Sequence, residues 1–190
     1  QGLWDKHPRF MIKTTASAIS WDEWAKKQGI KVVNVPVGFK EIANIMKKVE
    51  LKLKNSPEKE IIIDDVFGAP VNLGVNPRLL FGGEESGGMI MGTEELIESL
   101  AGRKAIAMRE KSATEAIIVA SALISKLQKA QVSLSEYLVE IFKENDIIGR
   151  YDTRVDIAYY NESEPDINKL KTDKVAGEAK RTKNDLFYLS

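Results

Sequence analysis

The chain contains no cysteine and only one histidine, His7, among its 190 residues. Without cysteine it forms no disulfide and no thiolate metal site, and a single histidine excludes a His-rich metal centre. The absence of cysteine fits a reducing cytoplasm, which is the compartment we expect. His7 follows Lys6 and precedes Pro8 near the start of the sequence, where we expect a solvated loop residue.

The chain also has no excess charge and no long apolar run. Its 28 basic and 28 acidic residues give a formal net charge of zero, which argues against nucleic acid as the main partner. The longest apolar stretch, residues 116–124, is interrupted by Ser121 and is far shorter than the roughly 20 residues of a membrane span. We therefore expect no membrane partner. The chain begins at Gln1 rather than methionine, so we expect a piece of a longer protein.

Apolar and β-branched runs alternate with amphipathic segments along most of the chain. Helices are predicted over residues 16–27, 40–53, 93–96, 113–131 and 134–144, and Ser133 to Glu136 form a capping box. Strands are predicted over residues 10–14, 30–35, 61–63, 105–108 and 154–159. Residues 66–78 contain Gly68, Pro70, Gly74 and Pro77 and are expected to be irregular, and Asp64-Asp65 to form a polar turn. Strands separated by helices predict a three-layer α/β domain.

The run Phe81-Gly82-Gly83-Glu84-Glu85-Ser86-Gly87-Gly88 places two carboxylates and a hydroxyl between pairs of glycines. It follows an apolar strand end, where open α/β sheets usually bind ligands. Carboxylates repel phosphate but accept hydrogen bonds from the neighbouring hydroxyls of a sugar. Taken alone, such a loop is more often a solvated turn than a sugar site.

This loop resembles the sugar-binding loop in the third domain of the α-D-phosphohexomutases, the phosphoglucomutase and phosphomannomutase family. Three further segments follow the same order: Met11 to Thr15 and Val35 to Lys40 resemble the first two strand ends of that domain. Met108-Arg109-Glu110-Lys111 resembles the family's R-E-K-D-G segment, although Ser112-Ala113 replaces Asp-Gly. Together the four segments cover about the first two-thirds of the chain.

The resemblance implies a four-stranded, mostly parallel mixed sheet between helices. It places the sugar-binding domain at residues 1–150, with an insertion at about 55–77 that forms a lid or a partner surface. Residues 151–190 are then a linker or the partial edge of the following C-terminal domain. The other domains of the parent chain are the expected partners.

The resemblance also implies which residues contact a hexose phosphate. Glu84 and Ser86 contact the O3 and O4 hydroxyls, which nearly exchange places when the sugar turns round, and Gly83 belongs to the same loop. Lys13 and Gly38 match positions near the sugar, although Lys13 is equally well explained as a lysine at the edge of a loop. Glu85 is expected to be structural or solvent-facing. Gly88 replaces a histidine of some relatives, which weakly favours glucose phosphates.

Arg109 and Lys111 match the segment that positions phosphate, because arginine binds two phosphate oxygens and lysine adds a point charge. An ordinary charged surface segment is the competing interpretation. The family's catalytic serine loop, magnesium loop and last phosphate loop have no counterpart in this sequence. We therefore expect no catalytic residue and no metal ligand in this chain, and no mutase activity from it alone. Mg²⁺ and a glucose 1,6-bisphosphate-type activator are expected to act through other domains.

Two alternatives remain open at this point. One is a non-catalytic sugar-phosphate-binding or interaction module with the same fold. The other is an unrelated α/β domain in which the glycine-rich loop is structural. Titration with a sugar phosphate separates the second alternative from the first.

Overall fold

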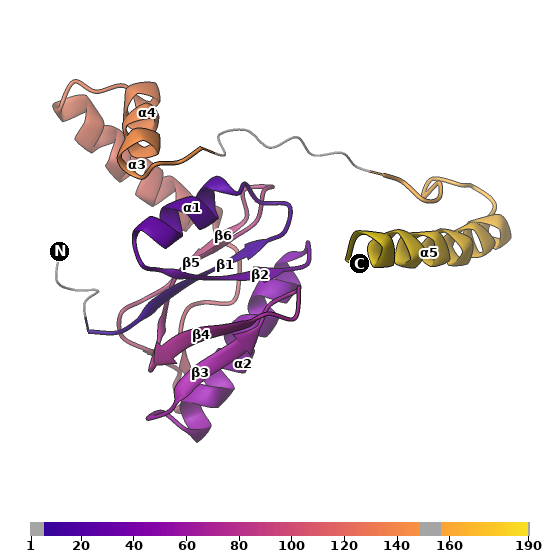
Figure 1. Cartoon of the computed structure of the whole chain (residues 1–190), viewed down its shortest axis with the longest axis horizontal. Helices are drawn as coiled ribbons and strands as arrows, with labels where there is room; N and C mark the ends of the chain where they lie inside the picture. Colours follow the sequence, from indigo (N-terminus) through magenta and orange to yellow (C-terminus); the bar gives the residue numbers. More distant parts are fainter. Residues whose placement is uncertain (1–5, 149–156, 190) are drawn as a thin grey trace. The chain divides into compact units, whose positions relative to one another are not determined.

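The computed structural model describes residues 6–148 and 157–189, and the chain divides into two compact units, residues 1–152 and 153–190. The first unit is an α/β fold with a four-stranded sheet in the order β2-β1-β5-β6 (Figure 1). These strands are β1 (Arg9–Thr14), β2 (Lys31–Val35), β5 (Arg78–Gly83) and β6 (Met89–Met91). β1 pairs in parallel with β2 and β5, whereas β6 is antiparallel to β5, so the predicted mixed, mostly parallel sheet is confirmed.

Helices lie on both faces of the sheet because successive residues of β1 point to opposite sides. Phe10 and Ile12 are fully buried in the main core, which α2 (Phe39–Asn55) completes from one face. Met11 packs on the other face with α1 (Ser20–Lys27). The predicted apolar stripe of α2 is buried in the main core and comprises Ile42, Ile45, Met46, Val49 and Leu53. α1 begins at Ser20 rather than at the predicted residue 16.

The segment expected to be irregular contains a strand, so that prediction is wrong. β3 (Glu60–Asp64) and β4 (Pro70–Val75) form an antiparallel hairpin, with a register shift between Glu60 and Ile62. Pro70 is tolerated because it is the first residue of its strand. The inward side chains of the hairpin, Ile61, Ile63 and Leu73, join the main core, so the hairpin is an integral part of the fold.

The short helix predicted at residues 93–96 is absent, and that prediction is also wrong. Thr93 does not cap a helix; its hydroxyl donates to the carbonyl of Glu95 at 2.6 Å. The chain then forms two short antiparallel strands, β7 (Ile97–Glu98) and β8 (Lys104–Ala105). The segment before the turn at Gly102 is short, and its backbone groups pair across this small ribbon instead of along a helix.

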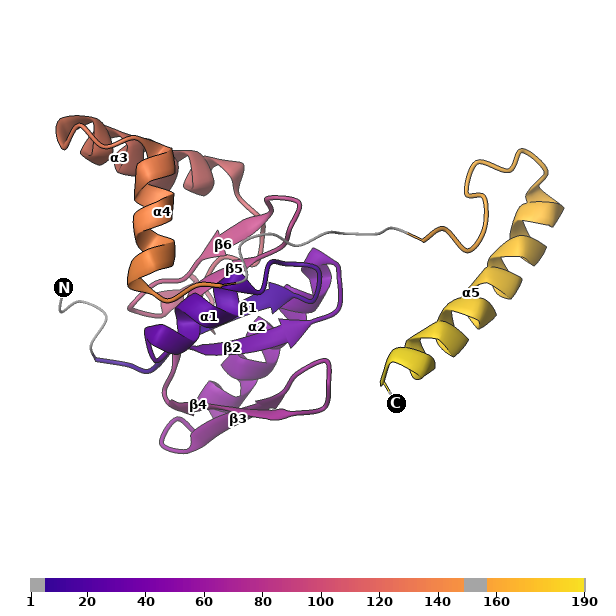
Figure 2. The same cartoon turned by 45° about the horizontal axis from the view of Figure 1, so that its top comes forward.

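The two long helices that end the first unit are close to their predicted bounds. They are α3 (Ala113–Lys129) and α4 (Leu134–Glu144), and the capping box at Ser133 is present. The end of α4 returns to the end of α1, where Lys27 Nζ lies 2.5 Å from Asp146 Oδ2 and Gln28 donates to Asn145 at 2.6 Å (Figure 2). These contacts tie the end of α4 to the end of α1.

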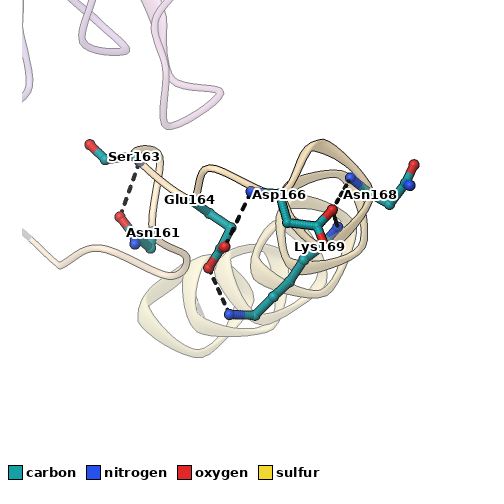
Figure 3. Close-up of polar contacts among 6 residues, drawn as sticks. All are labelled: Asn161, Ser163, Glu164, Asp166, Asn168 and Lys169. Atoms are coloured by element: carbon teal, nitrogen blue, oxygen red, sulfur yellow. Dashed lines mark hydrogen bonds and ion pairs between the residues drawn. The ribbon is translucent and has the colours of Figure 1, made fainter.

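The second unit contains α5 (Ile167–Leu189), which the sequence analysis did not predict. Asp166 precedes the helix, and its Oδ1 accepts from the backbone amides of Asn168 at 2.9 Å and Lys169 at 3.3 Å (Figure 3). Lys169 also donates to Glu164 at 2.6 Å, which lowers the pKa of Glu164 below its ordinary value. Half of the strand predicted at 154–159 lies on residues outside the described part of the chain, and the described half, residues 157–159, is not a strand, so the prediction is wrong there.

Candidate functional site

The candidate site lies at the edge of the sheet where β1, β2 and β5 end. Because these strands are parallel, their carboxyl ends meet at one edge. Lys13 lies in register between Asn34 on one side and Gly83 on the other. The loops that carry the candidate residues therefore come together, and both views show them on the same side of the sheet (Figures 1 and 2).

The glycine-rich loop joins β5 to β6 as a tight turn. The amide of Glu84 donates to the carbonyl of Gly88 at 3.0 Å, and the amide of Gly87 donates to the carbonyl of Glu84 at 3.1 Å. Gly87 has φ of +84°, a conformation that residues with a side chain rarely adopt. A Cβ at Gly88 would lie 2.5 Å from Glu84 Oε1. The glycine at this position therefore leaves room for the Glu84 carboxylate.

Glu84 is buried, with 8% of its surface exposed, and it is paired with a cation. Lys111 Nζ lies 2.8 Å from Glu84 Oε1. This hydrogen bond from Lys111 lowers the pKa of Glu84, a further hydrogen bond from Ser86 acts in the same direction, and burial opposes both. The carboxylate is thus ionised and ready to accept hydrogen bonds.

Ser86 is exposed and shares a hydrogen bond with Glu84. A carboxylate whose pKa is lowered is a weak general base, so this pair does not make Ser86 a strong nucleophile. The two side chains instead present an acceptor and a hydroxyl next to each other. That combination suits the recognition of sugar hydroxyls.

Glu85 turns to the neighbouring strand instead of joining Glu84. The hydroxyl of Thr14, which is fully buried, donates to Glu85 Oε2 at 2.7 Å. This bond ties the loop to the end of β1. It gives Glu85 a structural contact, which agrees with the structural role expected for it.

Lys111 reaches Glu84 because its segment is held beside β6, where the amide of Ser112 donates to the carbonyl of Met89 at 3.1 Å. Its ammonium also lies 5.3 Å from the ring centroid of Phe39, the first residue of α2. Gly38 comes directly before Phe39 with φ of +126° and has no atom within 4 Å of a Cβ placed on it. The structure therefore brings Gly38, Lys111, Glu84 and Ser86 together.

Lys13 and Gly83 belong to the same edge but have other neighbours. Lys13 is 4% exposed, and its ammonium donates to the carbonyl of Ser17 at 3.0 Å and pairs with Asp22 at 2.9 Å. A Cβ at Gly83 would lie 2.7 Å from the ring of Phe81, which packs edge-on against Trp21 with centroids 5.2 Å apart. These protein contacts explain the positions of both Lys13 and Gly83, so neither position requires a ligand.

Arg109 lies apart from Lys111 and points to α2. Its guanidinium forms an ion pair with Glu50, a buried residue of α2 that also accepts from the amide of Ile106 at 3.2 Å. Arg103 Nη2 lies 3.7 Å from the same carboxylate. Glu50 thus anchors the segment that ends in Lys111.

Three residues that contribute to the site were not predicted from the sequence: Thr14, Phe39 and Glu50. Thr14 and Phe39 lie within segments that were quoted for the resemblance, so their position beside the site residues was a usable signal. The sequence signal for Glu50 was weaker: it is an acidic residue next to Val49, on the apolar side of a helix that is otherwise rich in lysine.

Two properties of the described residues bear on metals and membranes. Within residues 6–148 and 157–189, no cluster of three or more acidic or histidine side chains has the arrangement of a metal site. In the same residues, no helix combines the length and the apolar character that crossing a bilayer requires.

Comparison with known proteins identifies the first unit. Residues 1–145 match the family model described as phosphoglucomutase/phosphomannomutase, alpha/beta/alpha domain III. Searches of curated proteins and of solved structures gave no match.

Proposed function

Because the chain belongs to the phosphoglucomutase/phosphomannomutase family, in which domain III contributes to sugar-phosphate binding, we propose that it is the sugar-recognition domain of a phosphohexomutase. The complete enzyme would interconvert hexose 1-phosphate and hexose 6-phosphate. The observation that carries the proposal is the ionised Glu84 beside Ser86 on a glycine loop, at the carboxyl edge of the sheet.

In the proposed reaction, a phosphoserine of another domain donates its phosphoryl group to the sugar monophosphate. The bisphosphate then turns round and returns the other phosphoryl group. Glu84 accepts hydrogen bonds from the O3 and O4 hydroxyls in either orientation, and Ser86 donates or accepts as each orientation requires. A site that grips these two hydroxyls holds the sugar equally well before and after the turn.

Lys111 supports this role because it covers Glu84 without sealing it. Its side chain is 52% exposed, so sugar hydroxyls can replace it at the carboxylate while its ammonium turns to the substrate phosphate. Arg109 contributes through its anchor on Glu50, and Lys13 and Gly38 shape the adjacent edge. The exchange of one partner of Glu84 for another keeps the buried carboxylate hydrogen-bonded throughout.

The residues for phosphoryl transfer are assigned to other domains. The serine, magnesium and last phosphate loops have no counterpart in this sequence, so Mg²⁺ and the bisphosphate activator would act elsewhere in the complete enzyme. Residues after about 150 would then lead to the fourth domain. We expect no turnover by this chain alone.

The test is titration of the ¹⁵N-labelled chain with glucose 1-phosphate, followed by NMR. We expect shifts at residues 83–88, Gly38 and Lys111, with weak affinity. Glu84→Gln should abolish these shifts, whereas Glu85→Gln, the matched control in the same loop, should keep them. No shifts in the wild-type chain, or equal effects of the two variants, would overturn the proposal. Mutase turnover by the purified chain would contradict the assignment of catalysis to other domains.

A further inference from the structure

The hairpin formed by β3 and β4 extends the candidate site at the outer edge of the sheet. β2 is the last strand on that side, and the turn between β3 and β4 lies beside its end. The amide of Val66 donates to the carbonyl of Asn34 at 2.9 Å. In both views this turn lies on the same side of the sheet as the loops that follow β1, β2 and β5 (Figures 1 and 2).

The register of the strands gives the distance of this turn from the glycine loop. Asn34, Lys13 and Gly83 lie side by side on three adjacent strands, and Val66 follows on the other side of Asn34. At a strand spacing of about 4.8 Å, Val66 lies roughly 14 Å from Gly83 along the edge. A side chain at the turn can therefore reach a sugar phosphate that is bound at Glu84.

The turn is well defined by its own hydrogen bonds. Asp65 Oδ1 accepts from the amides of Phe67 at 2.8 Å and Ala69 at 3.0 Å, which is the polar turn expected at this position. Gly68 supplies the positive φ of +74° that the turn requires. A hydrogen-bonded turn of this kind holds its side chains in place before a ligand arrives.

Phe67 is the large apolar side chain that this turn exposes most, more than Val66. It is 62% exposed, and Val37, in the loop that leads to Gly38, is 54% exposed. A groove of about 350 Å³ runs between the turn and α2 as far as Leu51, and Pro36, Glu41 and Val66 contribute to its lining. Phe67 follows Val66 directly at the end of this groove. An exposed aromatic ring beside a partly polar groove suits a ligand with an apolar C–H face and a polar rim.

We propose that Phe67 forms the outer wall of the sugar-phosphate site and packs its ring against the C–H face of the bound sugar. This inference rests on the proposed function and assigns to the insertion a part in substrate binding. The hairpin is held in the core by Leu73 and tethered to β2 through Val66, so Phe67 is a fixed wall and not a mobile lid.

The experiment compares Phe67→Ala with Val75→Ala by NMR titration of the chain with glucose 1-phosphate. Val75 is the matched control because it is an exposed apolar residue, at 43%, at the opposite end of the same hairpin. We expect Phe67→Ala to weaken binding about 3- to 10-fold. Val75→Ala should leave the affinity unchanged. Wild-type protein should also give a nuclear Overhauser effect between the Phe67 ring and sugar C–H protons.

The outcomes separate this inference from the proposed function. If the wild-type chain binds and Glu84→Gln does not, but Phe67→Ala binds like Val75→Ala, the wall is refuted and the proposed function stands. Phe67 would then be left as a contact for another domain or protein. If the wild-type chain does not bind the sugar phosphate, both proposals fail together.

Discussion

Lys111 Nζ lies 2.8 Å from Glu84 Oε1, although 27 residues separate them in the sequence. The pair joins the glycine-rich loop to the Arg109-Glu110-Lys111 segment, which are two of the segments that resemble the phosphohexomutases. Lys111 comes from the chain that leads into α3, and Glu84 follows the end of β5. The fold therefore brings two segments that are separate in the sequence into direct contact.

The first prediction concerns the acid side of the stability profile. The folded-state pKa of Glu84 is below its ordinary value because of Lys111, so the unfolded chain binds more protons at low pH. The stabilisation is present above the unfolded pKa of about 4.3 and is lost as pH falls through the lower folded value. Because Lys111 is half exposed, we expect a contribution of at most about 1 kcal/mol.

Urea unfolding of wild type and Glu84→Gln between pH 3 and pH 7 measures this contribution. The difference in the free energy of unfolding between the two proteins should be largest near neutral pH and shrink on acidification. Glu136→Gln is a positive control, because the lowered pKa of this capping-box carboxylate predicts a difference that also shrinks on acidification. A difference that grows towards low pH would contradict the assigned ion pair.

The second prediction separates the two glycines that end the loop. In Gly88→Ala the new Cβ would lie 2.5 Å from Glu84 Oε1 and 2.9 Å from Lys111 Cδ, so it should displace both side chains. In Gly87→Ala the Cβ meets no atom within 4 Å, but φ of +84° makes the backbone unfavourable by about 1 kcal/mol. We expect Gly88→Ala to lose glucose 1-phosphate binding, and Gly87→Ala to lose stability instead.

NMR titration and thermal unfolding of both variants check this division. The resonances of Lys111 and Glu84 should move in Gly88→Ala without ligand. If Gly88→Ala binds the sugar phosphate like wild type, the space at this position is not needed for a working Glu84 carboxylate.

Three strands of the main sheet, β1, β2 and β5, and the glycine loop were predictable because their signals are local, whereas β6 was not predicted. The β-branched runs at β1 and β2, and the alternation that buries Phe10 and Ile12, are visible in a window of a few residues. The glycine loop can be recognised from its own composition, because glycines flank two glutamates and a serine. The pairing of Lys111 with Glu84 was not predictable from either segment, because it depends on how β6 holds the chain beside the loop.

Two of the wrong predictions, the irregular segment at 66–78 and the helix at 93–96, have a common physical cause. Pro70 and Gly74 disfavour a strand locally, but β4 gains its place by burying Leu73 in the main core. Thr93 and the acidic residues after it resemble a helix start, but the backbone there pairs with residues 103–106 instead. In both segments tertiary contacts outweigh local preference. A local sequence pattern contains no information about contacts with residues that are distant in the sequence.

The third prediction concerns Glu50, which is 8% exposed and holds Arg109 and the amide of Ile106. Glu50→Ala leaves the guanidinium and the buried amide without their acceptor, and should lower the free energy of unfolding by about 3 kcal/mol. Arg103→Ala is the control, because its side chain is 61% exposed and it should cost less than about 1 kcal/mol. Urea denaturation measures both, and equal losses would show that Glu50 is not an anchor.

The last prediction tests whether the β3–β4 hairpin is part of the fold or an appendage to it. Leu73 is 1% exposed and packs in the main core, so Leu73→Ala should lower the free energy of unfolding by about 3 kcal/mol. Ile62 lies on the same hairpin with 45% of its surface exposed, and Ile62→Ala should cost less than about 1 kcal/mol. Both are measured by urea denaturation of the whole chain. If Leu73→Ala costs no more than Ile62→Ala, the hairpin unfolds apart from the core, and a turn on it could not hold Phe67 as a fixed wall beside the sheet.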